Sequence, residues 1–178
     1  MSFGAAYLED IARTYRTYHA LGEKAIAQVT DDAALNAQID PDSNSIAVIV
    51  KHVHGNLRSR FTDFLTTDGE KPDRNRDGEF ETPAPPARAQ ILGWWTDAFG
   101  IVLGAIAAMT PDDLERTVRI RHEAFLALEA INRSIAHTAY HTGQIVYVAR
   151  HLASGRWTSL TIPKGQSKDA SIGSYKSR

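Results

Sequence analysis

The chain has 178 residues, enough for one domain with a sizeable hydrophobic core. Hydrophobic residues make up 43% of it and charged residues 23%, and the formal net charge is -1. This balance argues against a disordered chain and against bulk attraction to nucleic acid or a membrane surface. The absence of cysteine excludes disulfides, a thiolate nucleophile and cysteine-ligated metals, so any transition metal would need histidine or carboxylate ligands.

The sequence shows no targeting or membrane-spanning signal. Its N-terminal residues lack a basic segment followed by an apolar one, and no run of 18 apolar residues occurs. We therefore expect a cytoplasmic protein that acts on a small molecule, with neither nucleic acid nor a membrane as its partner.

The first predicted element is a long amphipathic helix from Phe3 to about Val29, because apolar residues recur there every three or four positions. A connection rich in Asp, Asn and Pro follows at residues 31–44. Ser43, Asn44 or Ser45 at its end can cap the next helix by accepting free backbone N–H groups.

The second predicted helix runs from about Ser45 to Leu65 and has its own apolar stripe. His52 lies one position before Val53, a residue of that stripe, and so sits at the edge of the buried face. His54 is about 200° further round the helix and should point away from the partner of His52, as a surface or supporting residue.

Residues 66–88 combine charges of both signs with Gly and Pro and have no helical period, which predicts a long crossover. A loop of this length in a compact domain is typical of a lid or binding segment, and a mobile linker is the alternative. The next helix should begin with Pro85 and Pro86 in its first turn and carry an apolar stripe from Ile91 to Ile106.

A short extended segment is expected before the last helix. Val118 and Ile120 alternate there with Arg119 and Arg121, a pattern of extended chain that is too short to predict a sheet. Residues 1–178 should thus form a single domain, in which residues 155–178 are a partly ordered polar tail.

The fourth predicted helix, residues 124–154, is the element around which the chain is organised. Its apolar stripe is broken by Thr138 and Thr142 in the two turns that carry His137 and His141. The two histidines share one edge of the buried face, and imidazoles at this spacing are a common metal-ligand pair. A core role, with each histidine hydrogen-bonded inside the protein, fits the pair alone as well.

His52 holds the same edge position on its own helix and is the candidate for a third ligand, since an antiparallel bundle can bring the two edges together. Three histidine ligands leave an open position for water or substrate. Asn56, Arg133 and Gln144 lie one turn or less from these histidines and could orient ligands or hold an anionic substrate group. Arg133 could instead pair with Glu129, four residues earlier.

The last helix is apolar through more than half of its circumference, which indicates deep burial or a contact between two copies of the chain. We expect a homodimer on this basis.

Long stretches of the chain resemble a known group of proteins: SIAVIVKHVHGNLRSRFTDFLTTDGEKPDRNRDGEF, INRSIAHTAYHTGQIVYVARHL and SLTIPKGQS. Together with the four predicted helices, they resemble an uncharacterised branch of the DinB/YfiT-like superfamily of metal-dependent proteins. The resemblance covers nearly the whole chain. It implies an all-α, four-helix bundle with an up-down-down-up course and a long crossover between the second and third helices.

By the same resemblance the metal ligands are His52, His137 and His141. We expect the metal to be a divalent transition metal, zinc or nickel. Two positions depart from the pattern of the family: His54, where a small or apolar residue is expected, and His122, where glycine is more typical.

Members of the superfamily resemble transferases and isomerases that use low-molecular-weight thiols. The expected function is therefore a metal-dependent enzyme that activates water or such a thiol for transfer or hydrolysis on a small substrate. A non-catalytic, stress-associated dimeric binding protein with a structural or vestigial metal site is the alternative. A haem protein with His52 and His141 as axial ligands is a third option.

Overall fold

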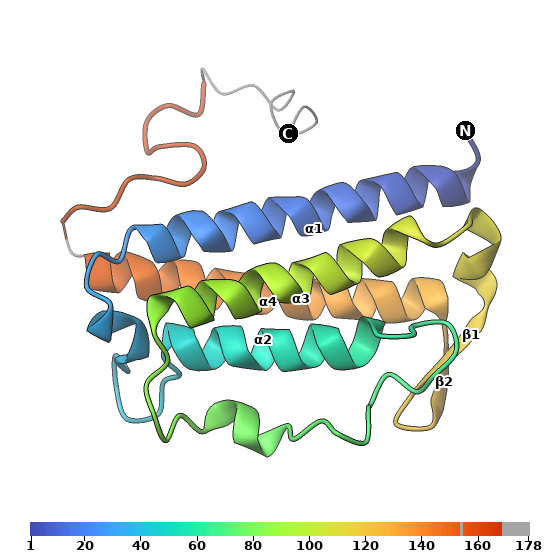
Figure 1. Ribbon diagram of the computed structural model, residues 1–178. Helices are drawn as coiled ribbons and strands as arrows, with labels where there is room; N and C mark the ends of the chain where they lie inside the picture. Colours follow the sequence, from blue (N-terminus) through green and yellow to red (C-terminus); the bar gives the residue numbers. More distant parts are fainter. Residues whose placement is uncertain (154, 169–178) are drawn as a thin grey trace.

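The structure, a computed structural model, describes residues 1–153 and 155–168. Helices α1 and α4 run in one direction and α2 and α3 in the other, which confirms an all-α four-helix bundle with an up-down-down-up course (Figure 1). The helices are α1 (Phe3–Ala27), α2 (Ile46–Phe61), α3 (Arg88–Ala107) and α4 (Ala127–Ala153). The shorter elements are the 3-10 helices η1 (Ala33–Asn36), η2 (Asp77–Phe80) and η3 (Pro111–Glu115) and the strands β1 (Thr117–Ile120) and β2 (Glu123–Leu126).

Helix α2 begins and ends at recognisable capping residues. Ser45 is the N-cap, and its hydroxyl accepts a hydrogen bond from the backbone N–H of Val48 at 3.3 Å. The helix ends at Phe61, four residues before the predicted Leu65, because the chain turns at Asp63 with a φ of 49°. This left-handed conformation is incompatible with a continuing helix.

Trp95 of α3 is among the largest fully buried side chains and fixes the distance between α3 and α1. A Cβ atom at Gly22 of α1 would lie 2.3 Å from Cζ2 of the indole, so only glycine permits this approach. The indole N–H also donates a hydrogen bond to the carbonyl of His19 at 3.0 Å, which satisfies its one polar atom.

Helix α3 is the most apolar helix of the bundle. By length and composition it is the one helix of the described chain that could cross a membrane, with a mean hydropathy of 1.3 over 18 residues. Ile91, Trp95 and Phe99 of this helix lie in the bundle core, and 33% of the 18-residue stretch is buried. The helix starts at Arg88, so Pro85 and Pro86 precede it, and their predicted place in its first turn was wrong.

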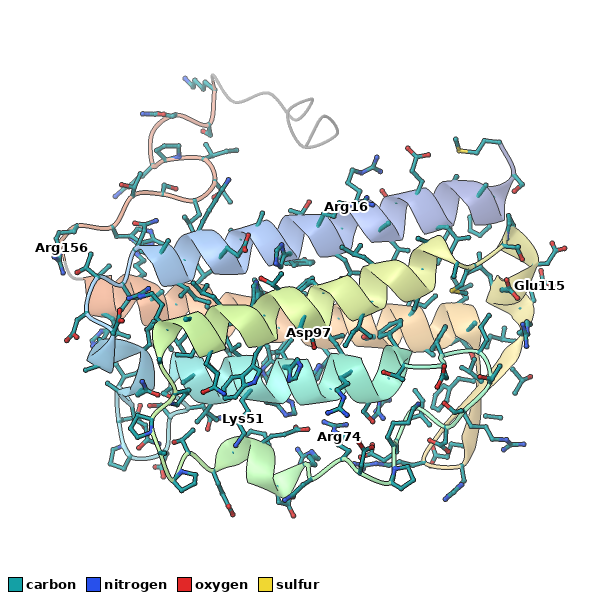
Figure 2. The ribbon with its side chains drawn as sticks, in the orientation of Figure 1. Arg16, Lys51, Arg74, Asp97, Glu115 and Arg156 are labelled. Atoms are coloured by element: carbon teal, nitrogen blue, oxygen red, sulfur yellow. The ribbon has the colours of Figure 1, made fainter. Side chains whose placement is uncertain are left out.

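The crossover, residues 62–87, returns along α2 and is tied to it by specific hydrogen bonds (Figure 1). Lys51 of α2 donates through Nζ to the carbonyls of Gly78 and Glu81, each at 2.7 Å; Figure 2 shows its side chain between α2 and the crossover. Because η2 also packs on α2, the part of the crossover around η2 is an ordered part of the domain.

The short segment before α4 is an antiparallel hairpin in which Ile120 pairs with Glu123 across a two-residue turn. The predicted extended chain is confirmed, but the expectation that it would form no sheet was wrong. The turn residues Arg121 and His122 have φ values of 54° and 68°, as a tight hairpin requires. Asp68 of the crossover stabilises this turn by accepting their backbone N–H groups at 2.9 and 2.8 Å.

The described part of the tail, residues 155–168, contains no helix or strand. The side-chain amide of Gln28 exchanges hydrogen bonds with the backbone of Thr158 at 2.9 and 2.7 Å, and Trp157 and Leu160 pack against the core. Residues 169–178, the rest of the predicted polar tail, lie outside the described residues.

We predict that His122→Gly raises the free energy of unfolding by about 0.5–1 kcal/mol, because glycine adopts a positive φ without the steric cost that a Cβ atom imposes. Urea denaturation followed by circular dichroism measures this change. Glu123→Gly, in the extended strand next to the turn, should have the opposite sign. A loss of stability in His122→Gly would show that the turn is not left-handed.

Asp68→Asn should lower stability at neutral pH and lose its effect in acid. The backbone N–H of Glu70, followed by those of His122 and Arg121, holds the Asp68 pKa at about 2 against the opposing effect of burial. A folded-state pKa below the unfolded value stabilises the protein above about pH 4, and this contribution disappears as the pH falls toward 2. Denaturation series at several pH values, with the exposed Asp42→Asn as control, test this; a difference independent of pH would contradict it.

Candidate metal centre

Helices α2 and α4 bring three histidines to one point in the bundle. The Nε2 atom of His137 lies 3.2 Å from Nε2 of His52 and 3.1 Å from Nε2 of His141. One ligand nitrogen from each residue lies within 4.8 Å of the other two. Two ligand nitrogens in a tetrahedral zinc site are about 3.3 Å apart. The spacing therefore suits a single divalent ion.

The outer nitrogens of two of the rings are hydrogen-bonded in a way that fixes their tautomers. Nδ1 of His52 lies 2.8 Å from Oε2 of Glu79, and Nδ1 of His141 lies 2.7 Å from Oε1 of Gln144. A carboxylate and an amide oxygen only accept hydrogen bonds, so each Nδ1 carries the proton. Each Nε2 then presents a lone pair to the centre of the cluster, as metal-binding histidines do.

His137 completes the cluster without a fixed tautomer. Its Nδ1 is buried and has no hydrogen-bond partner among the described residues. Burial, followed by the nearby rings of His141 and His52, lowers the pKa of His137 to about 3, and burial also lowers the pKa of His141. Both rings are therefore neutral at physiological pH, the form that binds metal.

The donor set itself favours a cation. If His137 carries its one ring proton on Nε2, it can donate to only one of its two neighbours, His52 or His141, and the Nε2 lone pair of the other is left without a donor. If His137 carries the proton on Nδ1 instead, the Nε2 lone pairs of all three rings face one another. A single divalent ion would accept all three lone pairs at once. The residues present therefore fit a metal.

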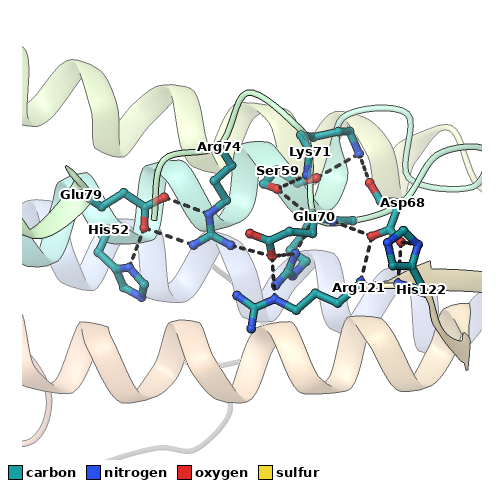
Figure 3. Close-up of polar contacts among 11 residues, drawn as sticks. His52, Ser59, Asp68, Glu70, Lys71, Arg74, Glu79, Arg121 and His122 are labelled. Atoms are coloured by element: carbon teal, nitrogen blue, oxygen red, sulfur yellow. Dashed lines mark hydrogen bonds and ion pairs between the residues drawn. The ribbon is translucent and has the colours of Figure 1, made fainter. Parts of the chain in front are cut away.

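Glu79 of η2 connects the cluster to the crossover. The side chain is buried, and it accepts hydrogen bonds from Nε and Nη2 of Arg74 at 2.9 and 3.1 Å (Figure 3). Burial raises the pKa of Glu79, but the hydrogen bonds from His52 and Arg74 outweigh it and hold that pKa below its usual value. Glu79 is thus an ionised acceptor for His52.

Gly55 is the residue that allows Glu79 to reach His52. It lies on α2 at the contact with η2, where an added Cβ atom would come within 2.1 Å of Oε1 of Glu79. Any other residue at this position would displace the carboxylate, or η2 as a whole.

The residues proposed to surround the histidines take different places. Gln144 hydrogen-bonds to His141 as described, whereas Asn56 and Arg133 line a cavity of about 340 Å³ next to His52 and His137. The alternative pairing of Arg133 with Glu129 is not formed. The Glu129 carboxylate instead accepts the backbone N–H of Leu126 at 2.8 Å.

His54 lies away from the cluster, as its position on the helix predicted. Its Nε2 is 2.8 Å from Oδ2 of Asp97 on α3, and its ring is stacked with Trp94 at a centroid distance of 6.4 Å. The ambiguity between His52 and His54 on α2 is therefore resolved in favour of His52 as a member of the cluster.

Two residues of the centre were missed from the sequence, Glu79 and Arg74. Both belong to the crossover, which has no periodicity from which a facing residue could be read. The one signal was Gly55 in the middle of a helix, where glycine is unfavourable unless another group approaches closely.

The fold and the cluster define a class of protein: a four-helix bundle with a candidate three-histidine metal site. Residues 2–166 match the family described as protein of unknown function (DUF1572), and the chain belongs to this family. A search of curated proteins finds no match to the chain.

We predict that Gly55→Ala weakens metal binding about 10- to 100-fold, the usual effect of removing a group that orients a histidine ligand. The added methyl group displaces Glu79 from His52, while alanine itself favours the helix. Competition with a chromophoric chelator measures the affinity. Gly104→Ala, at a helix position with open space, is the matched control; equal affinity in both variants would show that Glu79 does not support the site.

Proposed function

We propose that the protein is a metal-dependent enzyme in which His52, His137 and His141 bind a divalent transition metal, zinc or nickel. The observation that supports this most strongly is the convergence of the three Nε2 atoms, two of them with lone pairs directed inward by Glu79 and Gln144. The resemblance of the chain to the DinB/YfiT-like superfamily agrees with this ligand set.

When bound, such an ion supplies Lewis-acid chemistry, lowering the pKa of a coordinated water to about 7 or deprotonating a coordinated thiol. The three neutral histidines would hold it with one protein ligand fewer than a closed structural site has, as in catalytic sites, and His52 and His137 also line the neighbouring cavity. We propose transfer or hydrolysis on a small substrate, with water or a low-molecular-weight thiol as the nucleophile.

The proposal is tested by the metal content of protein produced without a metal-affinity tag. Elemental analysis should find about one divalent transition metal ion per chain, because a three-histidine site binds one ion. His52→Ala should lose most of it, and His54→Ala, which changes the neighbouring histidine that binds Asp97, should retain it. Equal metal content in the two variants would refute the site. A screen for thiol transfer with the metal-loaded protein then identifies the reaction.

A dimeric binding protein is the second candidate, and one observation favours it. Tyr140 and Tyr147 of α4, two turns apart, are 63% and 72% exposed. Large aromatic side chains on one helix face suit a contact with another chain. Sedimentation at micromolar concentration tests this. A dimer that Tyr140→Glu dissociates would support the contact, whereas a parent protein that is already monomeric would remove its basis.

A further inference from the structure

The cavity beside the histidines is unusually rich in arginine. Helix α2 contributes His52, Asn56 and Arg60 to its wall, and the rest of the wall comes from the crossover, the β1–β2 hairpin and α4, which includes His137. Glu123 is the one carboxylate among the residues that line it. The lining arginines are Arg60, Arg74, Arg76, Arg121 and Arg133.

Part of this positive charge is used within the protein. Glu70 lies 2.9 Å from Arg60 and 3.2 Å from Arg121, and Arg74 forms the paired contacts with Glu79 (Figure 3). Arg74 also lies 3.5 Å from Glu70. Because two carboxylates, Glu70 and Glu79, are shared among three arginines, the group keeps a net positive charge. These side chains are positioned by the fold and give the cavity a positive field.

Arg133 is different, since it has no ion-pair partner in residues 1–153 and 155–168. Its guanidinium carbon lies 6.0 Å from the centre of the Phe125 ring of β2, which holds the group at the wall of the cavity. Arg133 precedes His137 by four residues on α4, about 6 Å along the helix axis. It therefore lies on the same edge of α4 as the histidines, about one turn from His137 and two turns from His141.

The wall of the cavity also has an apolar part, formed by Ile120 of β1, Phe125 of β2 and Ala130 of α4. A volume of about 340 Å³ is near the lower end for small-molecule sites. Most such sites have a mainly apolar wall, whereas polar and charged side chains dominate this one. The wall of the cavity thus combines a cationic group, an apolar surface and two histidines of the candidate metal centre.

We propose that this cavity binds a small substrate with an anionic oxygen group, a carboxylate or phosphate, held by Arg133, with its apolar part against Phe125 and its reacting end at the histidines. Planar guanidinium groups bind both kinds of oxyanion through paired hydrogen bonds. This inference rests on the proposed function for the role of the metal end, but the anion site consists of residues outside the metal ligands.

The first experiment uses metal-free protein at low ionic strength. Calorimetric titration compares 3-phenylpropionate and phenyl phosphate with the neutral 3-phenylpropanamide. At least one anion should bind on the order of tenfold more tightly than the amide, the effect of one charge-assisted hydrogen-bonded pair, and the stronger of the two identifies the oxyanion. Equal affinities for all three compounds would overturn the proposal.

Variants locate the site. Arg133→Gln should remove most of the preference for the anion, because only the field of the other lining arginines then remains. Arg150→Gln, also an exposed arginine of α4 but one that does not line the cavity, should keep it. Circular dichroism checks that both variants are folded, which the exposure of Arg133 leads us to expect. An undiminished preference in Arg133→Gln would overturn the assignment.

A second experiment separates this inference from the proposed function. Protein loaded with cobalt(II) is titrated with 3-mercaptopropionate and its neutral amide, and binding is followed through the visible and near-ultraviolet absorption of the cobalt site. The carboxylate should bind on the order of tenfold more tightly than the amide in the parent protein, and most of this difference should disappear in Arg133→Gln.

The outcomes of the cobalt experiment are distinct. Equal binding of the two thiols in the parent protein would overturn the anion site and leave the metal function standing. Failure of the histidines to bind cobalt would refute the proposed function, and the preference for an anion in the metal-free titration would still support the anion site.

Discussion

The hydrogen bond between Glu79 and His52 is the interaction on which the candidate site depends. It fixes the proton of His52 on the outer nitrogen, so that the inner lone pair faces the two histidines of α4. It also joins the crossover to α2, because Glu79 is bound by Arg74 and comes close only where Gly55 leaves room. The chemistry of the centre and the path of the crossover therefore share one buried carboxylate.

The remainder of the crossover has a second anchor at the end of the bundle. Asp68 binds the left-handed turn of the hairpin, and Glu70 lies between Arg60 and Arg121. These contacts place β1 and β2 at the cavity that His52 and His137 also line. The hairpin, which adds little to the core, thus has a clear structural role: it supplies Ile120 and Phe125 to the wall of the cavity.

The helices and the histidine cluster could be predicted because their signals are local or repeat along the chain. The four-residue spacing of His137 and His141 and the edge position of His52 were enough to select three residues that meet in the structure. Glu79 could not be predicted, since it lies 27 residues from His52 in a loop without periodicity. The hairpin was missed because Arg121 and His122 occupy turn positions where glycine, asparagine or aspartate is usual. They adopt the turn conformation with hydrogen bonds to Asp68.

The most direct test of the account is the proton position on each histidine in the metal-free protein. Long-range ¹H–¹⁵N correlation spectra of the imidazole rings distinguish the two neutral tautomers. We predict protonated Nδ1 and bare Nε2 for both His52 and His141, with the resonance of His52 changing in Gly55→Ala. Protonated Nε2 on these two rings would contradict it, because their inner nitrogens would then be donors with no lone pair for a metal.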